Sequence, residues 1–191
     1  VLRLAVEHEF FVVEDDVYGD FSPAVRQTFA ELDNLDRVIY IGSFSKCLSA
    51  SLRVGFIACS HDLIEPLTRL KLLTCVAVPA FCERFVNTIL SDGTYARHMN
   101  DVQQRLIRQQ VQTQRLLIER GWQFEIAPQG GMFLWVYHPD LPDLQPLVRK
   151  LEQNKILLMP GSAFAVTRDY RRYARINCTH FSETLADHFN V

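Results

Sequence analysis

The chain has 191 residues, of which 48% are hydrophobic and 22% charged, a composition typical of globular proteins that excludes wholesale disorder. Its formal net charge of -2 gives no overall electrostatic reason to bind DNA or an anionic membrane. The five cysteines are scattered and form no CxxC pair, so we expect neither a disulfide framework nor a metal site, and a reducing compartment is favoured. No apolar run reaches the length that spans a bilayer, and we expect a cytoplasmic protein.

Three short apolar runs predict the strands of one sheet in the first part of the chain. After a helix end at residues 1–9, they cover residues 10–13, 37–41 and 54–59. The first run is continuously apolar, which predicts a strand buried on both faces, as in a parallel α/β sheet. The spacing between the second and third runs leaves no room for a crossover helix, so we expect the third strand to run antiparallel.

Helical patterns follow these strands. The first covers residues 62–73 and opens with a capping-box pattern, in which Asp62 is followed three residues later by Glu65. The second begins at Pro79 and ends at Asp92-Gly93, where the glycine is a typical helix stop.

A long amphipathic helix is predicted over residues 94–120. Its apolar positions Tyr95, Met99, Val102 and Leu106 recur at helical spacing, and its other faces are rich in Gln and Arg. Gly121 then ends the helical pattern.

The remainder of the chain alternates short strands and helices. Strands are predicted over residues 123–127, 132–137, 156–159 and 173–178, and helices over residues 144–154 and 182–189. We therefore expect an α/β fold with a partial large domain, residues 1–115, followed by a small α+β domain, residues 116–191.

Lys46 is the main candidate for chemistry. It ends the run Gly42-Ser43-Phe44-Ser45-Lys46 after the second predicted strand, and Arg53 follows. A lysine that forms a Schiff base with pyridoxal phosphate needs phosphate-binding neighbours, and Ser43, Ser45 and Arg53 supply suitable donors. The alternative is an exposed loop lysine, which is the commoner case for a lysine in a loop.

Asp15 follows the first predicted strand. Ligands in open α/β sheets collect at the carboxyl ends of strands, so Asp15 and the Lys46 loop are expected to face one crevice. A carboxylate there would keep the cofactor's pyridine nitrogen protonated, and Tyr18 would hydrogen-bond the phenolic oxygen of the ring. For Asp15 taken alone, a solvated acidic loop formed with Glu14 and Asp16 is the favoured alternative.

These motifs occur in the order of the cofactor half of class I/II aminotransferases of fold type I, which the chain resembles over most of its length. The matching segments are residues 13–21, 40–46, 52–55, 128–135, 159–164 and 174–177. Several separated motifs in the right order make chance agreement an unsatisfactory explanation.

The resemblance implies a role for each candidate residue. Catalytic and cofactor-binding roles are implied for Lys46, Asp15 and Tyr18. Contacts with the cofactor phosphate are implied for Ser43, Ser45 and Arg53. Arg175 resembles the arginine that binds the substrate α-carboxylate, a role that suits a planar guanidinium.

Residues 81–85 and 92–98 resemble a subgroup, the aminotransferase-like domain of MocR-type regulators in the GntR superfamily. In those proteins the domain follows a winged helix-turn-helix, so DNA would be contacted only by an N-terminal domain absent from this chain. The resemblance further implies a homodimer and a small amino-acid or amine ligand. We therefore expect a pyridoxal-phosphate-binding effector and oligomerisation domain of a transcriptional regulator.

Two alternatives remain open. A free-standing class I/II amino-acid aminotransferase would use the same residues for full transamination. The family's domain also begins well before Val1, and its Gly-rich phosphate-binding turn, ring-stacking aromatic residue and O3′-contacting asparagine are expected upstream. A truncated fragment without cofactor competence is therefore the second alternative.

Overall fold

The computed structural model describes residues 1–22, 26–128, 130–166 and 169–190. The chain divides into two compact units, Val1–Asp101 and Val102–Val191, and the division falls within helix α5 (Thr94–Ile118). The boundary expected after residue 115 lies further along the same helix. Because one continuous helix contributes to both units, its periodicity carries no signal for the point of division.

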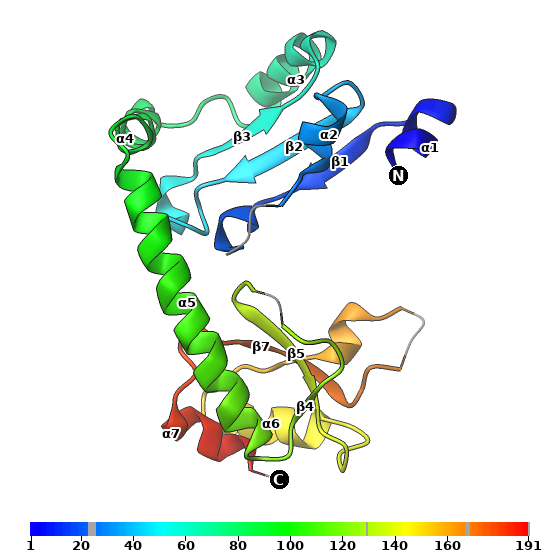
Figure 1. The fold of residues 1–191 in the computed structure, drawn as a ribbon, viewed down its shortest axis with the longest axis vertical. Helices are drawn as coiled ribbons and strands as arrows, with labels where there is room; N and C mark the ends of the chain where they lie inside the picture. The colour runs from blue at the N-terminus through cyan, green and yellow to red at the C-terminus, as the bar shows by residue number, and fades with distance from the viewer. Residues whose placement is uncertain (23–25, 129, 167–168, 191) are drawn as a thin grey trace. The chain divides into compact units, whose positions relative to one another are not determined.

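The first unit contains a three-stranded sheet in the order β1-β2-β3 (Figure 1). β1 (Val12–Asp15) pairs parallel with β2 (Val38–Ser43), and β3 (Gly55–Ala58) pairs antiparallel with β2. The antiparallel third strand is therefore confirmed. The carboxyl ends of β1 and β2 meet at one edge of the sheet, because parallel strands point the same way.

The expectation of a first strand buried on both faces is wrong. β1 begins at Val12 rather than Phe10, and the Val13 side chain is 59% exposed. β1 is an edge strand in this sheet, paired on one side only, and its alternate side chains are open to solvent. Continuous apolar character therefore does not establish burial on both faces.

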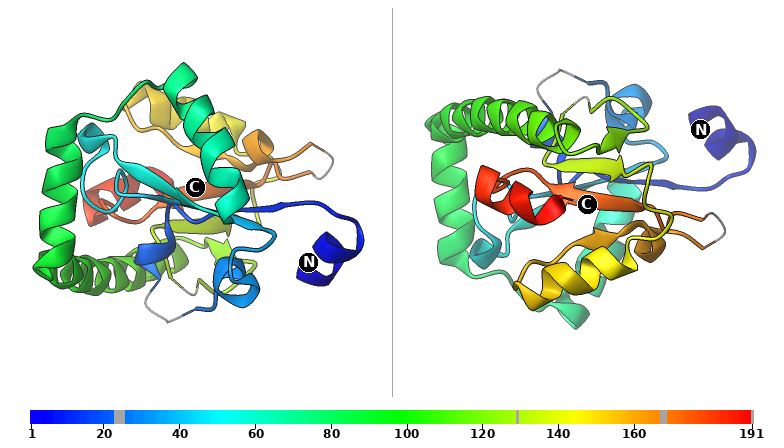
Figure 2. Two further views of the ribbon diagram at one scale, coloured as in Figure 1. Left: turned by 90° about the horizontal axis from the view of Figure 1, so that it is seen from above. Right: turned by 90° about the horizontal axis from the view of Figure 1, so that it is seen from below.

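The helices of the first unit are short apart from the pair that precedes α5. They are α1 (Leu2–Glu7), α2 (Phe29–Asp33), α3 (His61–Thr74) and α4 (Ala80–Ser91), with 3-10 turns at Gly19–Phe21 and Ala50–Leu52. α3 lies along β3 in both Figure 1 and Figure 2.

Two details at helix starts differ from expectation. The predicted capping box at Asp62 is wrong, because the cap of α3 is Ser60 and no side-chain hydrogen bond closes it. α2 was not predicted, and its start is fixed by Thr28, whose hydroxyl accepts a hydrogen bond from the backbone N–H of Glu31 at 3.0 Å.

The second unit contains a four-stranded antiparallel sheet in the order β4-β5-β7-β6. Its strands are β4 (Gln123–Phe124), β5 (Phe133–Tyr137), β6 (Met159–Pro160) and β7 (Tyr173–Asn177). Alternate side chains of the two central strands are buried on one face: Leu134, Val136, Ala174 and Ile176. Helices α6 (Gln145–Gln153) and α7 (Glu183–Ala186) lie in front of this sheet in the view from below (Figure 2).

Trp122 connects the end of the chain to the core of the second unit. Its side chain is 1% exposed, and its indole N–H donates to the carbonyl oxygen of Phe189 at 3.1 Å. Phe189 lies in a 3-10 turn, Asp187–Phe189, and its ring meets the Trp122 ring edge-on with a centroid separation of 5.8 Å.

Within the described residues, no helix is both long and apolar enough to cross a lipid bilayer.

Candidate functional site

Lys46 and Tyr18 come together in the first unit. Both residues follow the carboxyl end of a strand, Tyr18 after β1 and Lys46 after β2. The Lys46 ammonium lies over the Tyr18 ring, 5.7 Å from its centroid, and both side chains are exposed. A cation over a ring face at an exposed site is attracted by about 0.5–1 kcal/mol, so this contact orients the lysine only weakly.

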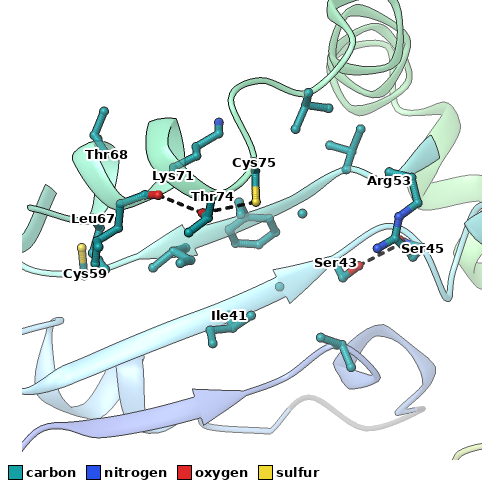
Figure 3. A pocket seen from close by; sticks show the side chains of 18 of the residues that line it. Ile41, Ser43, Ser45, Arg53, Cys59, Leu67, Thr68, Lys71, Thr74 and Cys75 are labelled. Atoms are coloured by element: carbon teal, nitrogen blue, oxygen red, sulfur yellow. Dashed lines mark hydrogen bonds between the residues drawn. The ribbon is translucent and has the colours of Figure 1, made fainter. Parts of the chain in front are cut away.

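A pocket of about 800 Å³ lies between the sheet and α3, with three predicted phosphate contacts at one end (Figure 3). These lining residues are Ser43, Ser45 and Arg53. The Ser43 hydroxyl accepts a hydrogen bond from the backbone N–H of Ser45 at 3.2 Å, and the Arg53 side chain extends toward both serines (Figure 3). Two hydroxyls and a guanidinium form a donor set that suits a phosphate.

The other walls of the pocket are mostly apolar. Ile41 and Ile57 contribute from the sheet, and Ile64 and Leu67 contribute from α3. A lysine of α3, Lys71, also lines the pocket, whereas Lys46 follows the lining residue Ser45 in the chain. The sequence predicted this helix but not that it forms a wall of the pocket.

Asp15 shares the sheet face of this pocket. It pairs with Ile41, which pairs in turn with Ile57, and residues paired across strands project to the same face. The Asp15 carboxylate accepts a hydrogen bond from the backbone N–H of Val17 at 3.4 Å, and Val17 lines the pocket. The loop after β1 therefore borders the pocket through Val17, and the segment before Lys46 borders it through Ser43 and Ser45.

The two acids beside Asp15 have structural partners. The Glu14 carboxylate accepts hydrogen bonds from the backbone N–H groups of Phe29 and Ala30, at 3.1 and 2.9 Å. Asp16 accepts a hydrogen bond from the Tyr40 hydroxyl at 2.8 Å and pairs with Arg26. A solvated acidic loop therefore does not describe Glu14 or Asp16.

Burial favours the neutral form of the Tyr40 phenol. Burial, followed by the negative charge of Asp20, raises the pKa of Tyr40. The phenol therefore keeps its proton and donates to Asp16 at any physiological pH.

Arg53 reaches the pocket through an uncommon backbone conformation. Its φ of 53° and ψ of 33° place it in the left-handed region, which costs a side-chain-bearing residue about 1 kcal/mol or more. The chain then turns into β3 at Gly55, where an added Cβ would lie 2.9 Å from the Gly42 carbonyl oxygen. The backbones at Gly55 and Gly42 therefore lie close together, and this places Arg53 near the end of β2.

Arg175 lies in the second unit, on β7. Its guanidinium carbon is 4.3 Å from the centroid of the Phe133 ring and 4.9 Å from that of the Phe164 ring. Of the nearby predicted segment 128–135, Gln129 lies outside the described residues, and Gly131 has a φ of 79° that only glycine adopts readily.

Comparison with known proteins identifies relatives along the whole chain. The family described as aminotransferase class I and II matches residues 1–189. The uncharacterized HTH-type transcriptional regulator YjiR of Escherichia coli (strain K12) is 33% identical, over 98% of this chain and 41% of that protein. Aromatic-amino-acid aminotransferase 1 of Thermococcus litoralis is 28% identical, over 96% of this chain and 45% of that protein.

A solved structure extends the likeness to the fold. The kynurenine aminotransferase of Pyrococcus horikoshii, crystallised in complex with PMP, superposes with a TM-score of 0.85 at 28% identity. The match covers 99% of this chain and 48% of that chain. The chain thus spans somewhat less than half the length of the relatives that it matches.

Proposed function

Because the chain belongs to the class I and II aminotransferase family, we propose that it forms part of the effector and oligomerisation domain of a MocR-type transcriptional regulator. Its fold is the α/β fold of the pyridoxal-phosphate-dependent aminotransferases, and the family indicates pyridoxal phosphate as the cofactor. Its relatives include both HTH-type regulators and aminotransferases. The regulatory role is supported by residues 81–85 and 92–98 and by the similarity to YjiR.

The convergence of Ser43, Ser45 and Arg53 on one pocket beside Lys46 is the observation that carries the cofactor part of this proposal. Their donors fit a phosphate group, and the apolar walls on either side fit a flat aromatic ring. The residues present therefore fit pyridoxal phosphate.

Each proposed site residue would then have one task. Bound pyridoxal phosphate supplies a ring that withdraws electrons from the amino compound attached to it. Lys46 would hold the cofactor through its amine as a Schiff base and move a proton at the ligand's α-carbon. Asp15 would keep the pyridine nitrogen protonated, and Tyr18 would hydrogen-bond the phenolic oxygen. Arg175 would bind the ligand's α-carboxylate through paired N–H donors.

The proposed partners follow from the regulatory role. The ligand would be a small amino acid or amine, and a second copy of the protein would complete a homodimer. DNA would be bound by a separate N-terminal domain of the HTH type, and the protein would act in the cytoplasm.

A free-standing amino-acid aminotransferase is the second candidate. It is favoured by the likeness to the aminotransferases of Thermococcus litoralis and Pyrococcus horikoshii. Both candidates use the same side chains, so turnover separates them. The regulator should release keto acid slowly or not at all, whereas fast turnover of a common amino acid would favour the enzyme.

Absorbance spectroscopy tests the assignment of Lys46. The complete protein mixed with pyridoxal phosphate should develop the visible band of a lysine-bound cofactor, and Lys46→Ala should abolish that band. Lys71→Ala is the matched control, because it removes a lysine that lines the pocket and should leave the band in place. A band of undiminished strength in Lys46→Ala would rule out the assignment.

A further inference from the structure

The first turns of α5 contact both loops that carry the proposed cofactor residues. The Tyr95 hydroxyl donates to the carboxylate of Asp20, which follows Tyr18 by two residues. The same hydroxyl lies 3.1 Å from Sγ of Cys47, the residue next to Lys46. A single side chain therefore connects the Tyr18 loop to the Lys46 loop.

His98 adds a second contact from the same helix. It lies three residues after Tyr95, on the same side of α5. Its Nε2 is 2.9 Å from the carbonyl oxygen of Cys47, so a protonated Nε2 donates to the backbone directly after Lys46. The Lys46 loop is thus held at both the side chain and the main chain of Cys47.

The centre of this network is shielded from water. Cys47 is 6% exposed, and the Tyr95 ring packs edge-on against the buried Phe44 with a centroid separation of 5.6 Å. Burial, followed by the hydrogen bond to Asp20, raises the pKa of Tyr95 above its ordinary value, so the phenol remains a donor. Burial also raises the pKa of the Cys47 thiol, which donates to the Ser43 carbonyl oxygen at 3.6 Å.

The strand ladder does not reach the residues that this network holds. β1 ends at Asp15 and β2 ends at Ser43, and the last paired residues of these strands are Asp15 with Ile41 and Ser43 with Gly55. Tyr18 and Lys46 lie beyond those pairs. A functional side chain on a loop is placed accurately only when neighbouring groups fix that loop, and Tyr95 contacts both loops.

We propose that Tyr95, supported by His98, is a positioning residue that holds Tyr18 and Lys46 at a fixed separation for cofactor binding. Tyr95 acts through Asp20 and Cys47 and does not itself contact cofactor or ligand. The role in cofactor binding rests on the proposed function, whereas the connection between the two loops exists without a cofactor.

Alkylation of Cys47 in the cofactor-free protein measures the connection directly. Tyr95→Phe keeps the ring against Phe44 and removes both hydroxyl contacts, so Cys47 should be alkylated about tenfold faster, as expected for the loss of one buried hydrogen bond. Labelled peptides are quantified by mass spectrometry, with the buried Cys178 of the second unit as internal reference. Tyr137→Phe, which removes a hydroxyl bonded to Gln123 at 2.6 Å, is the matched control and should leave the labelling of Cys47 unchanged.

Titration with pyridoxal phosphate then measures the positioning role. Tyr95→Phe should raise the cofactor concentration that gives half of the visible band about tenfold, while Tyr137→Phe leaves it unchanged. Asp20→Asn keeps the size of the acceptor and weakens the same hydrogen bond, so it should change both measurements in the same direction by a smaller factor. Asp20→Asn also provides the test of the proposal if Tyr95→Phe does not fold.

Three results would overturn the proposal. They are unchanged labelling of Cys47 in Tyr95→Phe, an equal increase at Cys47 and Cys178, and faster labelling of Cys47 with unaltered cofactor binding. Failure of the proposed function is a separate result, because it appears as a band that survives Lys46→Ala.

Discussion

The two units of the chain differ in how completely they bury their own apolar side chains. Among the described residues, the largest fully buried side chains lie in the second unit, with Val38 as the exception. The first unit instead leaves large apolar side chains open on β1, β3, α3 and α4. Examples are Val13, Ile57, Leu73 and Phe81.

The difference in burial suggests that the second unit contributes most to stability, whereas the first unit carries the proposed cofactor residues. The second unit closes a core between one sheet face and its helices, so its side chains are expected to determine resistance to unfolding. The first unit carries the proposed cofactor residues on loops, and its exposed apolar surface is of the kind that marks interaction sites. The same chain therefore contains one unit whose largest apolar side chains are fully buried and one that leaves many of its large apolar side chains exposed.

The largest expected effect comes from a paired truncation in the two units. Trp122→Ala removes a buried ring and its hydrogen bond to Phe189, and should lower the free energy of unfolding by about 3–5 kcal/mol. Phe81→Ala removes a ring that is 78% exposed and should change the free energy of unfolding by no more than about 0.5 kcal/mol. Urea denaturation of both variants provides the measurement. Equal losses would show that the first unit buries Phe81 in solution.

Thiol reactivity should differ between the units by a large factor as well. Burial raises the pKa of the Cys178 thiol to about 11, so at pH 8 only about one molecule in a thousand carries the reactive thiolate. Cys75 of the first unit is exposed. Alkylation at pH 8 should therefore modify Cys75 at least about a hundredfold faster than Cys178. Comparable rates would mean that the core of the second unit opens readily.

Arg175→Ala tests the assignment of ligand binding to the second unit. Loss of the guanidinium should weaken the spectral response to an amino acid about thirtyfold, the effect of losing charged hydrogen bonds worth about 2 kcal/mol. Binding of pyridoxal phosphate should remain at the wild-type level. If the variant loses cofactor and amino acid equally, Arg175 is a structural residue held by Phe133 and Phe164.

The smallest effect concerns an exposed ion pair of the second unit. Hydrogen bonds from Arg171 lower the pKa of Asp169 to about 2, from an ordinary value of 3.8. Because the folded-state pKa is lowered, the pair stabilises the fold above pH 3.8, and its contribution is lost as the pH falls toward 2. Arg171→Ala should return the carboxyl titration of Asp169, followed by NMR, toward 3.8. An unchanged midpoint would show that Arg171 has no part in the shift.

Local sequence patterns predicted the order of the main elements. The short spacing between the runs at residues 37–41 and 54–59 correctly required an antiparallel strand, and Gly93 and Gly121 marked real helix ends. These features depend on neighbouring residues alone, which is why one sequence is enough to predict them. The five-residue helix α2 was not predicted: Thr28 caps it locally, but two of its first N–H groups donate to Glu14, which is distant in sequence.

Contacts between distant residues were not predictable in the same way. The sequence identified Tyr95 only as an apolar position of an amphipathic helix, since its partners Asp20 and Cys47 lie far away along the chain. The α3 wall of the pocket, including Lys71, likewise depends on how a helix packs on a sheet. The proposed chemistry of Lys46 came from its local motif, whereas the groups that position it came from the structure.

Trapping of the bound cofactor tests the central claim most directly. The complete protein is loaded with pyridoxal phosphate, reduced with borohydride, digested and analysed by peptide mass spectrometry. We predict a phosphopyridoxyl group on Lys46, with Lys71, Lys150 and Lys155 unmodified. Modification of Lys71, which lines the pocket, or of no lysine in the chain would contradict the account.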